Sequence, residues 1–97
     1  MAAPQSDPAH NAIAEEAEAT ACGVIRMETL FLTRYGTAYG LLDEITAGYE
    51  CAIKSDAYRL ADYVGDLVWI SGPLVMAGEM PVLEVTNLRL VKMKWMR

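Results

Sequence analysis

The sequence predicts an all-β domain, a closed five-stranded barrel whose open end is capped by one short helix. Apolar and polar residues alternate in several short segments, and glycine or proline separates these segments from one another. One stretch, residues 55–65, changes from this period of two to the period of a helix. The 97 residues, 54% hydrophobic and 22% charged, are enough for one compact domain with a single core.

The N-terminal residues differ in composition from the rest of the chain. Residues 1–20 contain four of the 13 acidic residues and none of the eight basic ones, and Ile13 is their only large apolar side chain after the initial methionine. A segment with so little apolar surface cannot contribute much to a core. We therefore expect residues 1–20 to form an acidic arm, disordered or a frayed helix, and residues 21–97 to form a barrel that is close to neutral.

Five segments have the alternation that is typical of strands. They are residues 21–33, 37–44, 49–54, 66–75 and 81–93. In the first, Ile25, Met27 and Phe31 share one face. A tight break at residues 34–36 indicates a hairpin to the second strand. The first three strands are expected to form a meander.

The capping helix is expected within residues 55–65. Ser55 or Asp56 can cap its start, and Gly65 suits the left-handed residue that follows a helix end. Leu60 and Val64 lie on its apolar stripe and are expected to plug the mouth of the barrel. A helix of barely two turns depends on such packing for its stability.

The last two strands carry features that affect the surface. In the fourth strand Val68 and Ile70 are expected to face the interior, which turns Trp69 outward, and Gly72-Pro73 should stop or bend the strand. In the fifth, the apolar phase shifts at Asn87. This shift predicts a bulge that brings Leu88 and Leu90 into the inner set.

Closing the five strands into a barrel removes most of the exposed edges that a flat sheet would leave. The run L-x-x-Y-V-G-x-x-V-x-I-S-G at residues 60–72, followed by P-V-L-E-V-T-N-L at residues 81–88, resembles the OB-fold, in particular small single-domain bacterial OB-fold proteins. The resemblance covers about residues 21–93. It implies a fold that supports many unrelated functions.

The resemblance also implies a binding face for single-stranded nucleic acid or oligosaccharide on the second and third strands. In this chain that face would contain Tyr35, Tyr39, Tyr49 and Lys54, with the loop at residues 76–80 nearby. Aromatic rings in a basic groove stack with bases. The carboxylates Asp43, Glu44 and Glu50 lie among these rings and would repel phosphate, which departs from the pattern of such binders.

No catalytic, metal or cofactor signature is present in the sequence. The single histidine, His10, lies in the arm, so no hydroxyl in the barrel has a histidine base beside it and no metal set can be assembled. Cys22 and Cys51 are expected to be reduced and mostly buried. Asp43 and Glu44 are adjacent and face opposite sides of a strand, the wrong geometry for an acid/base pair. We expect no enzyme, no cofactor and no metal.

The chain has no apolar run near the roughly 20 residues that a membrane span requires. It also has no basic start followed by an apolar region, so no secretory signal is expected. We therefore expect a cytoplasmic protein with no membrane contact.

Two functions remain open at this point. The first is a non-enzymatic module that acts by protein contact around the outward Trp69, through self-association into a homo-oligomer or docking to a larger assembly. The alternative is single-stranded nucleic-acid binding on the face of the second and third strands. The basic, aromatic terminus with Lys92, Lys94 and Trp95 could contact a nucleic-acid backbone, or it could be a solvated end.

Overall fold

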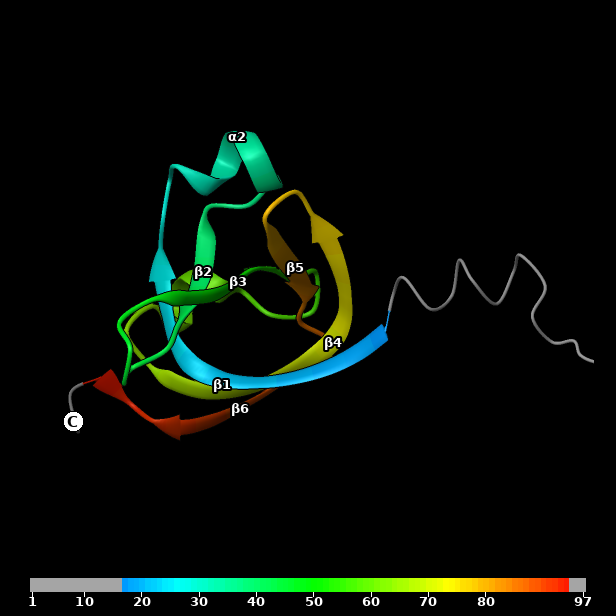
Figure 1. Ribbon diagram of the computed structural model, residues 1–97. Helices are drawn as coiled ribbons and strands as arrows, with labels where there is room; N and C mark the ends of the chain where they lie inside the picture. The colour runs from blue at the N-terminus through cyan, green and yellow to red at the C-terminus, as the bar shows by residue number, and fades with distance from the viewer. Residues whose placement is uncertain (1–16, 95–97) are drawn as a thin grey trace, which may run out of the picture.

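The computed structural model describes residues 17–94 of the 97-residue chain (Figure 1). Its elements are β1 (Ala17–Met27), α2 (Phe31–Tyr35), β2 (Tyr39–Leu42), β3 (Tyr49–Lys54), the 3-10 helix η1 (Leu60–Tyr63), β4 (Leu67–Ala77), β5 (Met80–Glu84) and β6 (Asn87–Lys92). Residues 1–16 of the expected acidic arm lie outside the described residues. Residues 17–20, which were assigned to the arm, belong to β1.

The strands close into a barrel. The order is β1-β2-β3-β5-β4, and β4 pairs back onto β1. The β3–β5 pair is parallel, whereas the other pairs along this circuit are antiparallel. This arrangement is compatible with the OB fold, and the prediction of an all-β, closed five-stranded barrel is confirmed. The sixth strand, β6, adds to β4 outside this circuit.

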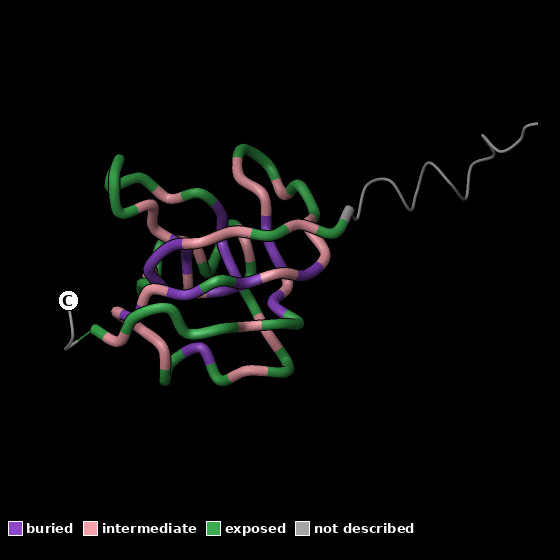
Figure 2. The backbone as a smooth tube through the Cα atoms, turned by 90° about the horizontal axis from the view of Figure 1, so that it is seen from below, coloured by how far each residue is buried: buried purple, intermediate pink, exposed green. Residues whose placement is uncertain are grey.

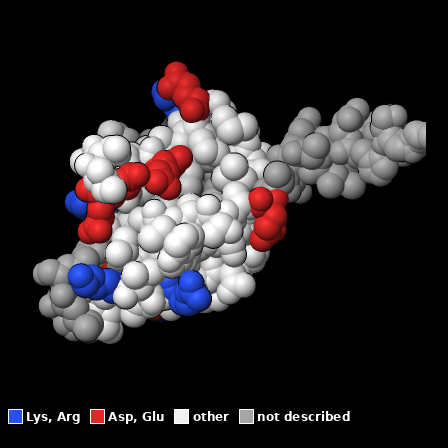
Figure 3. Space-filling model, turned by 60° about the horizontal axis from the view of Figure 1, so that its bottom comes forward, with Lys and Arg blue, Asp and Glu red and all other residues white. Residues whose placement is uncertain are grey.

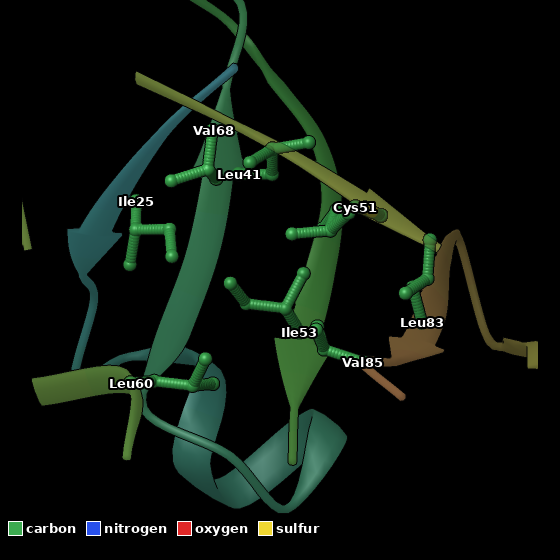
Figure 4. Close-up of a cluster of buried hydrophobic side chains, with 9 residues drawn as sticks. Ile25, Leu41, Cys51, Ile53, Leu60, Val68, Leu83 and Val85 are labelled. Atoms are coloured by element: carbon green, nitrogen blue, oxygen red, sulfur yellow. The ribbon is translucent and has the colours of Figure 1, made fainter. Parts of the chain in front are cut away.

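The core fills the inside of the barrel with branched apolar side chains from every barrel strand (Figure 4). The largest fully buried side chains are Ile25, Leu41, Ile53, Ile70, Leu83, Val68 and Val85. Strand alternation sets their direction, because successive side chains point to opposite faces. Burial therefore concentrates in the strands and gives way to exposed residues at the turns (Figure 2).

The first strand ends earlier than the sequence predicted, at Met27 and not at residue 33. β1 stops at Met27, which is 54% exposed rather than inside. The backbone N–H of Phe31 donates to the oxygen of Glu28, which begins a helical turn and moves Phe31 out of the strand. The expected tight break at residues 34–36 is instead the end of α2, where Gly36 adopts the left-handed conformation.

The expected capping helix is reduced to η1, a single turn of 3-10 helix. The Ser55 hydroxyl caps the turn that leads to it, because it accepts from the N–H of Tyr58 at 3.0 Å and donates to the oxygen of Val85 at 2.6 Å. Leu60 is buried and packs in the core cluster. Gly65 has a φ of 94°, so the predicted plug and left-handed glycine are both present.

The fourth strand continues through Gly72-Pro73 instead of stopping there. On one edge, β4 pairs with β1. On the other edge it pairs with β6 over Leu67 to Ser71 and with β5 from Leu74 onward, so the partner on this edge changes at Gly72. The backbone oxygen of Glu84 lies 1.7 Å from where a Cβ of residue 72 would stand. Only glycine allows the two strands to approach this closely.

The expected fifth strand is two strands, β5 and β6, which are separated at Val85 and Thr86. Leu88 packs against the core as predicted. Leu90 faces the same inner side, opposite Val68, but stays 40% exposed and outside the core cluster. The reason is the position of β6. It lies on the free edge of β4, outside the closed circuit of strands, so the core covers only part of its inner face.

Candidate functional site

The face of β2 and β3, which the sequence resemblance implies as a binding face, is covered by an aromatic cluster. Phe31 of α2 contacts Tyr35 and Tyr49 edge to face, with ring centroids 5.2 Å and 4.9 Å apart. Gly40 makes room for it, because a Cβ there would lie 2.7 Å from the rings of Phe31 and Tyr49. These rings therefore pack on one another and on the sheet.

The other two residues expected on this face, Tyr39 and Lys54, lie near each other and border one hollow. Tyr39 packs against the core cluster, since it lies on the same side of β2 as the buried Leu41. Its ring therefore turns toward the core, and its predicted role in binding stays a prediction. Lys54 is exposed at the end of β3 and borders a hollow of about 340 Å³ together with Tyr35. Lys54 and Glu84 are register partners at the parallel junction of β3 and β5.

Carboxylates dominate the turn between β2 and β3. Asp43 accepts from the N–H groups of Ile45 and Thr46 at 2.7 and 3.2 Å, and these bonds lower the pKa of Asp43. Burial and then the hydrogen bond and charge of Asp43 raise the pKa of Glu50. This end of the β2–β3 face is acidic and does not offer a basic groove.

We predict that Glu50→Gln raises the free energy of unfolding at pH 7 by less than about 1 kcal/mol, since solvent screens most of the repulsion. A raised pKa means that the folded state holds the proton more tightly than the unfolded state. The protonated Glu50 therefore stabilises the fold at low pH. This contribution is lost as the pH rises from the usual glutamate pKa of 4.5 through the raised pKa of Glu50. Urea unfolding at pH 7 and below pH 4 measures this, and the difference between variant and wild type should shrink at the lower pH.

Glu79→Gln is the matched control, because Glu79 is exposed in the β4–β5 turn. It is expected to leave stability unchanged within about 0.5 kcal/mol. A Glu50→Gln protein that is less stable than wild type at pH 7 would contradict the interpretation.

A second surface lies on the opposite wall, where β1, β4 and β6 form a three-stranded sheet. Trp69 lies between Cys22 of β1 and Arg89 of β6, and 42% of it is exposed, as its predicted outward direction requires. A hollow of about 230 Å³ opens beside it, which we call the Trp69 hollow. Its lining residues are Thr20, Trp69, Ile70, Ser71, Asn87, Leu88 and Arg89.

The polar side chains of the Trp69 hollow have no partner of their own. Among residues 17–94, no hydrogen bond or ion pair involves the side chains of Thr20, Ser71, Asn87 or Arg89. No carboxylate lines the hollow. Figure 3 turns the side with β1, β4 and β6 toward the viewer and shows a broad uncharged surface with charged side chains at its margins. Such a surface can form contacts with another molecule.

The basic residues near the C-terminus have different surroundings in the structure. Lys92 is exposed at the end of β6. Lys94 is engaged, because its backbone N–H donates to Oδ1 of the buried Asp66 at 2.9 Å and its Nζ donates to the oxygen of Val64 at 3.0 Å. Lys94 thus ties the segment after β6 to the residues between η1 and β4. Trp95 lies outside the described residues.

Sequence reasoning found Trp69 but missed its neighbours in the hollow. The alternation of Arg89 between Leu88 and Leu90 was a signal that Arg89 points outward. No local signal joins Thr20 to Asn87, since they meet only through the pairing of β1 and β6 with Ser71 of β4.

Neither cysteine shows the features of a reactive thiol. Cys22 and Cys51 are free. Burial, followed by the charge of Glu50, raises the pKa of Cys51 to about 12 and also raises the pKa of Cys22. Both thiols therefore stay protonated near neutral pH, where a thiolate would be needed for nucleophilic attack.

This geometry defines the fold class of the protein, which is an all-β barrel compatible with the OB fold. Comparison of the chain with models of known protein families, with curated proteins and with solved structures found no match. Within residues 17–94, no helix has the length and apolarity to cross a membrane, and no cluster of His, Cys, Asp or Glu side chains could hold a metal ion.

Proposed function

We propose that this chain is a non-enzymatic binding module that acts through protein contact, and that the Trp69 hollow is its contact surface. The contact is either self-association into a homo-oligomer or docking to a larger assembly. The proposal includes a cytoplasmic location and the small, single-domain bacterial OB type that the sequence resembles. It involves no cofactor or metal.

The exposed indole of Trp69 supports this proposal most strongly. Tryptophan and arginine are the residues that most often dominate protein interfaces when truncated, and here Trp69 and Arg89 are cross-strand neighbours. The unpartnered hydroxyls and amide around them can supply the directional bonds that a polar rim provides. Arg89 is the only charged residue that lines the hollow, and one basic side chain supplies little of the charge neutralisation on which binding to a phosphate backbone depends.

Single-stranded nucleic acid is the second candidate, favoured by the aromatic cluster on the β2–β3 side. Arg34 and Lys54 lie near Tyr35 and could meet phosphates. Against this, the rings already pack edge to face, and carboxylates of Asp43 and Glu50 flank the sheet. Fluorescence anisotropy with labelled oligonucleotides at low salt decides between the candidates, because submicromolar binding would reverse their order.

We predict that Trp69→Ala removes the protein contact and leaves the fold intact. Light scattering after size exclusion should show a mass above that of the monomer for wild type, or a pull-down with wild type should retain a specific partner. Trp69→Ala should have the monomer mass in the first case and should not retain the partner in the second. A loss of roughly tenfold or more in affinity is expected for a buried tryptophan anchor.

Leu32→Ala is the matched control, since Leu32 is an apolar residue of α2 that is 56% exposed. It should behave as wild type in both assays. A monomeric wild type whose captured partners are the same with and without Trp69→Ala would reject the proposal.

A further inference from the structure

The outermost strand of the three-stranded sheet has an open edge. β6 pairs with β4 on one side, and no strand among residues 17–94 pairs with its other side. In Figure 1, β6 runs along the bottom of the molecule, beyond β4. Such an edge presents free N–H and C=O groups that can bond to another extended chain.

The outer side of this edge is basic. Arg89 and Lys92 are exposed and lie opposite Trp69 and Leu67 of β4, on the outer face of the sheet. Neither of them forms an ion pair within the described part of the chain. Residues 85–94 contain no Asp or Glu that could neutralise them. The edge therefore attracts negative charge.

The inner side of the same edge is apolar. Leu88 and Leu90 lie opposite Ile70 and Val68, which point into the core, so they share the inner face of the sheet. Leu90 remains 40% exposed, and the neighbouring Val91 is 47% exposed. The register shift between Leu67 and Val68 leaves Val91 without a partner and sets Lys92 on the same face as Arg89. Backbone groups, positive charge and apolar surface thus lie side by side along this edge.

We propose that the open edge of β6 binds an extended acidic segment of a partner protein by strand addition. Acidic side chains of the added strand lie on the outer face beside Arg89 and Lys92. Alternate apolar side chains lie on the inner face beside Leu88 and Leu90. This inference rests on the proposed function, because it names the partner chemistry and binding mode at the same sheet.

Charge selects this occupant over a second copy of β6. An antiparallel pair of two β6 strands carries Arg89 and Lys92 twice and no acidic residue, and like charges that face each other across a strand pair are destabilising. An acidic strand reverses the sign of that interaction. Charge-assisted hydrogen bonds to Arg89 then add to the main-chain bonds.

The test uses the full chain and two synthetic acetylated peptides, one with alternating Glu and Val and one with alternating Lys and Val. Backbone amide NMR measures binding and hydrogen exchange. The Glu-Val peptide is expected to shift the resonances of Asn87–Lys92 and to slow their exchange, whereas the Lys-Val peptide is not. Arg89→Glu should weaken binding roughly tenfold or more. Arg34→Glu, a charge reversal on α2, should not.

Methylation of alternate backbone nitrogens in the Glu-Val peptide separates strand addition from simple charge attraction. It removes donors without changing charge, so strand addition predicts that binding is lost. Equal binding of both peptides, retained binding after methylation, shifts on another surface or no shifts at millimolar peptide would each overturn the proposal. Protection of β6 amides that appears without peptide and vanishes on dilution would identify a second copy and overturn it too.

These outcomes are distinct from failure of the proposed function. If the peptides do not bind but Trp69→Ala still removes self-association or partner capture, strand addition alone is rejected. If Trp69→Ala has no effect on either, the contact surface itself is rejected.

Discussion

Gly72→Ala is expected to destabilise the barrel by about 3 kcal/mol or more, and unfolding at room temperature would be consistent with it. The new Cβ would stand 1.7 Å from the backbone oxygen of Glu84. This oxygen belongs to β5 and cannot rotate away as a side chain could, so β4 and β5 must separate where β4 changes partner. Urea unfolding followed by far-UV circular dichroism measures the loss.

Gly48→Ala is the matched control. Its new Cβ would meet only Thr46 Oγ1 at 3.7 Å, which is ordinary contact distance. We expect stability to change by no more than about 0.5 kcal/mol. Equal stability of the Gly72→Ala and Gly48→Ala proteins would show that β4 and β5 do not approach each other in this way.

Ile53→Ala is expected to lower the free energy of unfolding by about 2–5 kcal/mol. Ile53 has no exposed surface and lies in the core cluster, so truncation loses apolar burial and leaves a cavity among packed side chains. Its place on β3, beside the parallel junction with β5, also makes the loss a test of barrel closure.

Ile45→Ala tests the same chemical change without burial, because Ile45 is 94% exposed in the turn between β2 and β3. It is expected to change stability by no more than about 0.5 kcal/mol. Similar losses at the two positions in thermal or urea unfolding would contradict the placement of Ile53 inside.

The barrel could be predicted from the sequence because its causes are local and repeated. Val68 and Ile70 alternate with Trp69, and the structure places the first two inside and Trp69 at the surface. The backbone of Gly65 is left-handed at the point where the helical pattern of residues 55–65 gives way to the pattern of a strand. Closure followed from the cost of open edges, which is a general physical argument.

The details that escaped prediction depend on contacts between distant segments. Phe31 has strand-forming neighbours, but it leaves β1 because it packs over Gly40 and against Tyr49. The predicted fifth strand divides into β5 and β6 at the end of the barrel wall, which no residue type marks. The resemblance placed Tyr39 on the binding face with Tyr49, whereas in the structure Tyr39 shares the inner side of β2 with the buried Leu41.

The candidate site shows the same division. Alternation was enough to turn Trp69 outward. The polar partners of the Trp69 hollow come from three strands that are far apart in sequence, and the pairing register brings them together. The acidic character of the β2–β3 turn was visible from Asp43 and Glu50 in the sequence, and the structure adds the burial and the nearby Asp43 that together raise the pKa of Glu50.

Hydrogen exchange at the Val85 amide tests the central claim, the closure of the barrel, most directly. This N–H donates to the oxygen of Lys54 at 2.7 Å, next to the junction where β3 meets β5, and the side chain of Val85 is fully buried. A closed barrel predicts that this amide exchanges as slowly as the core amides of β1 and β4, through global unfolding. Exchange as fast as in the turn at residues 44–47 would mean that β3 and β5 are not joined, and the sheet would be open.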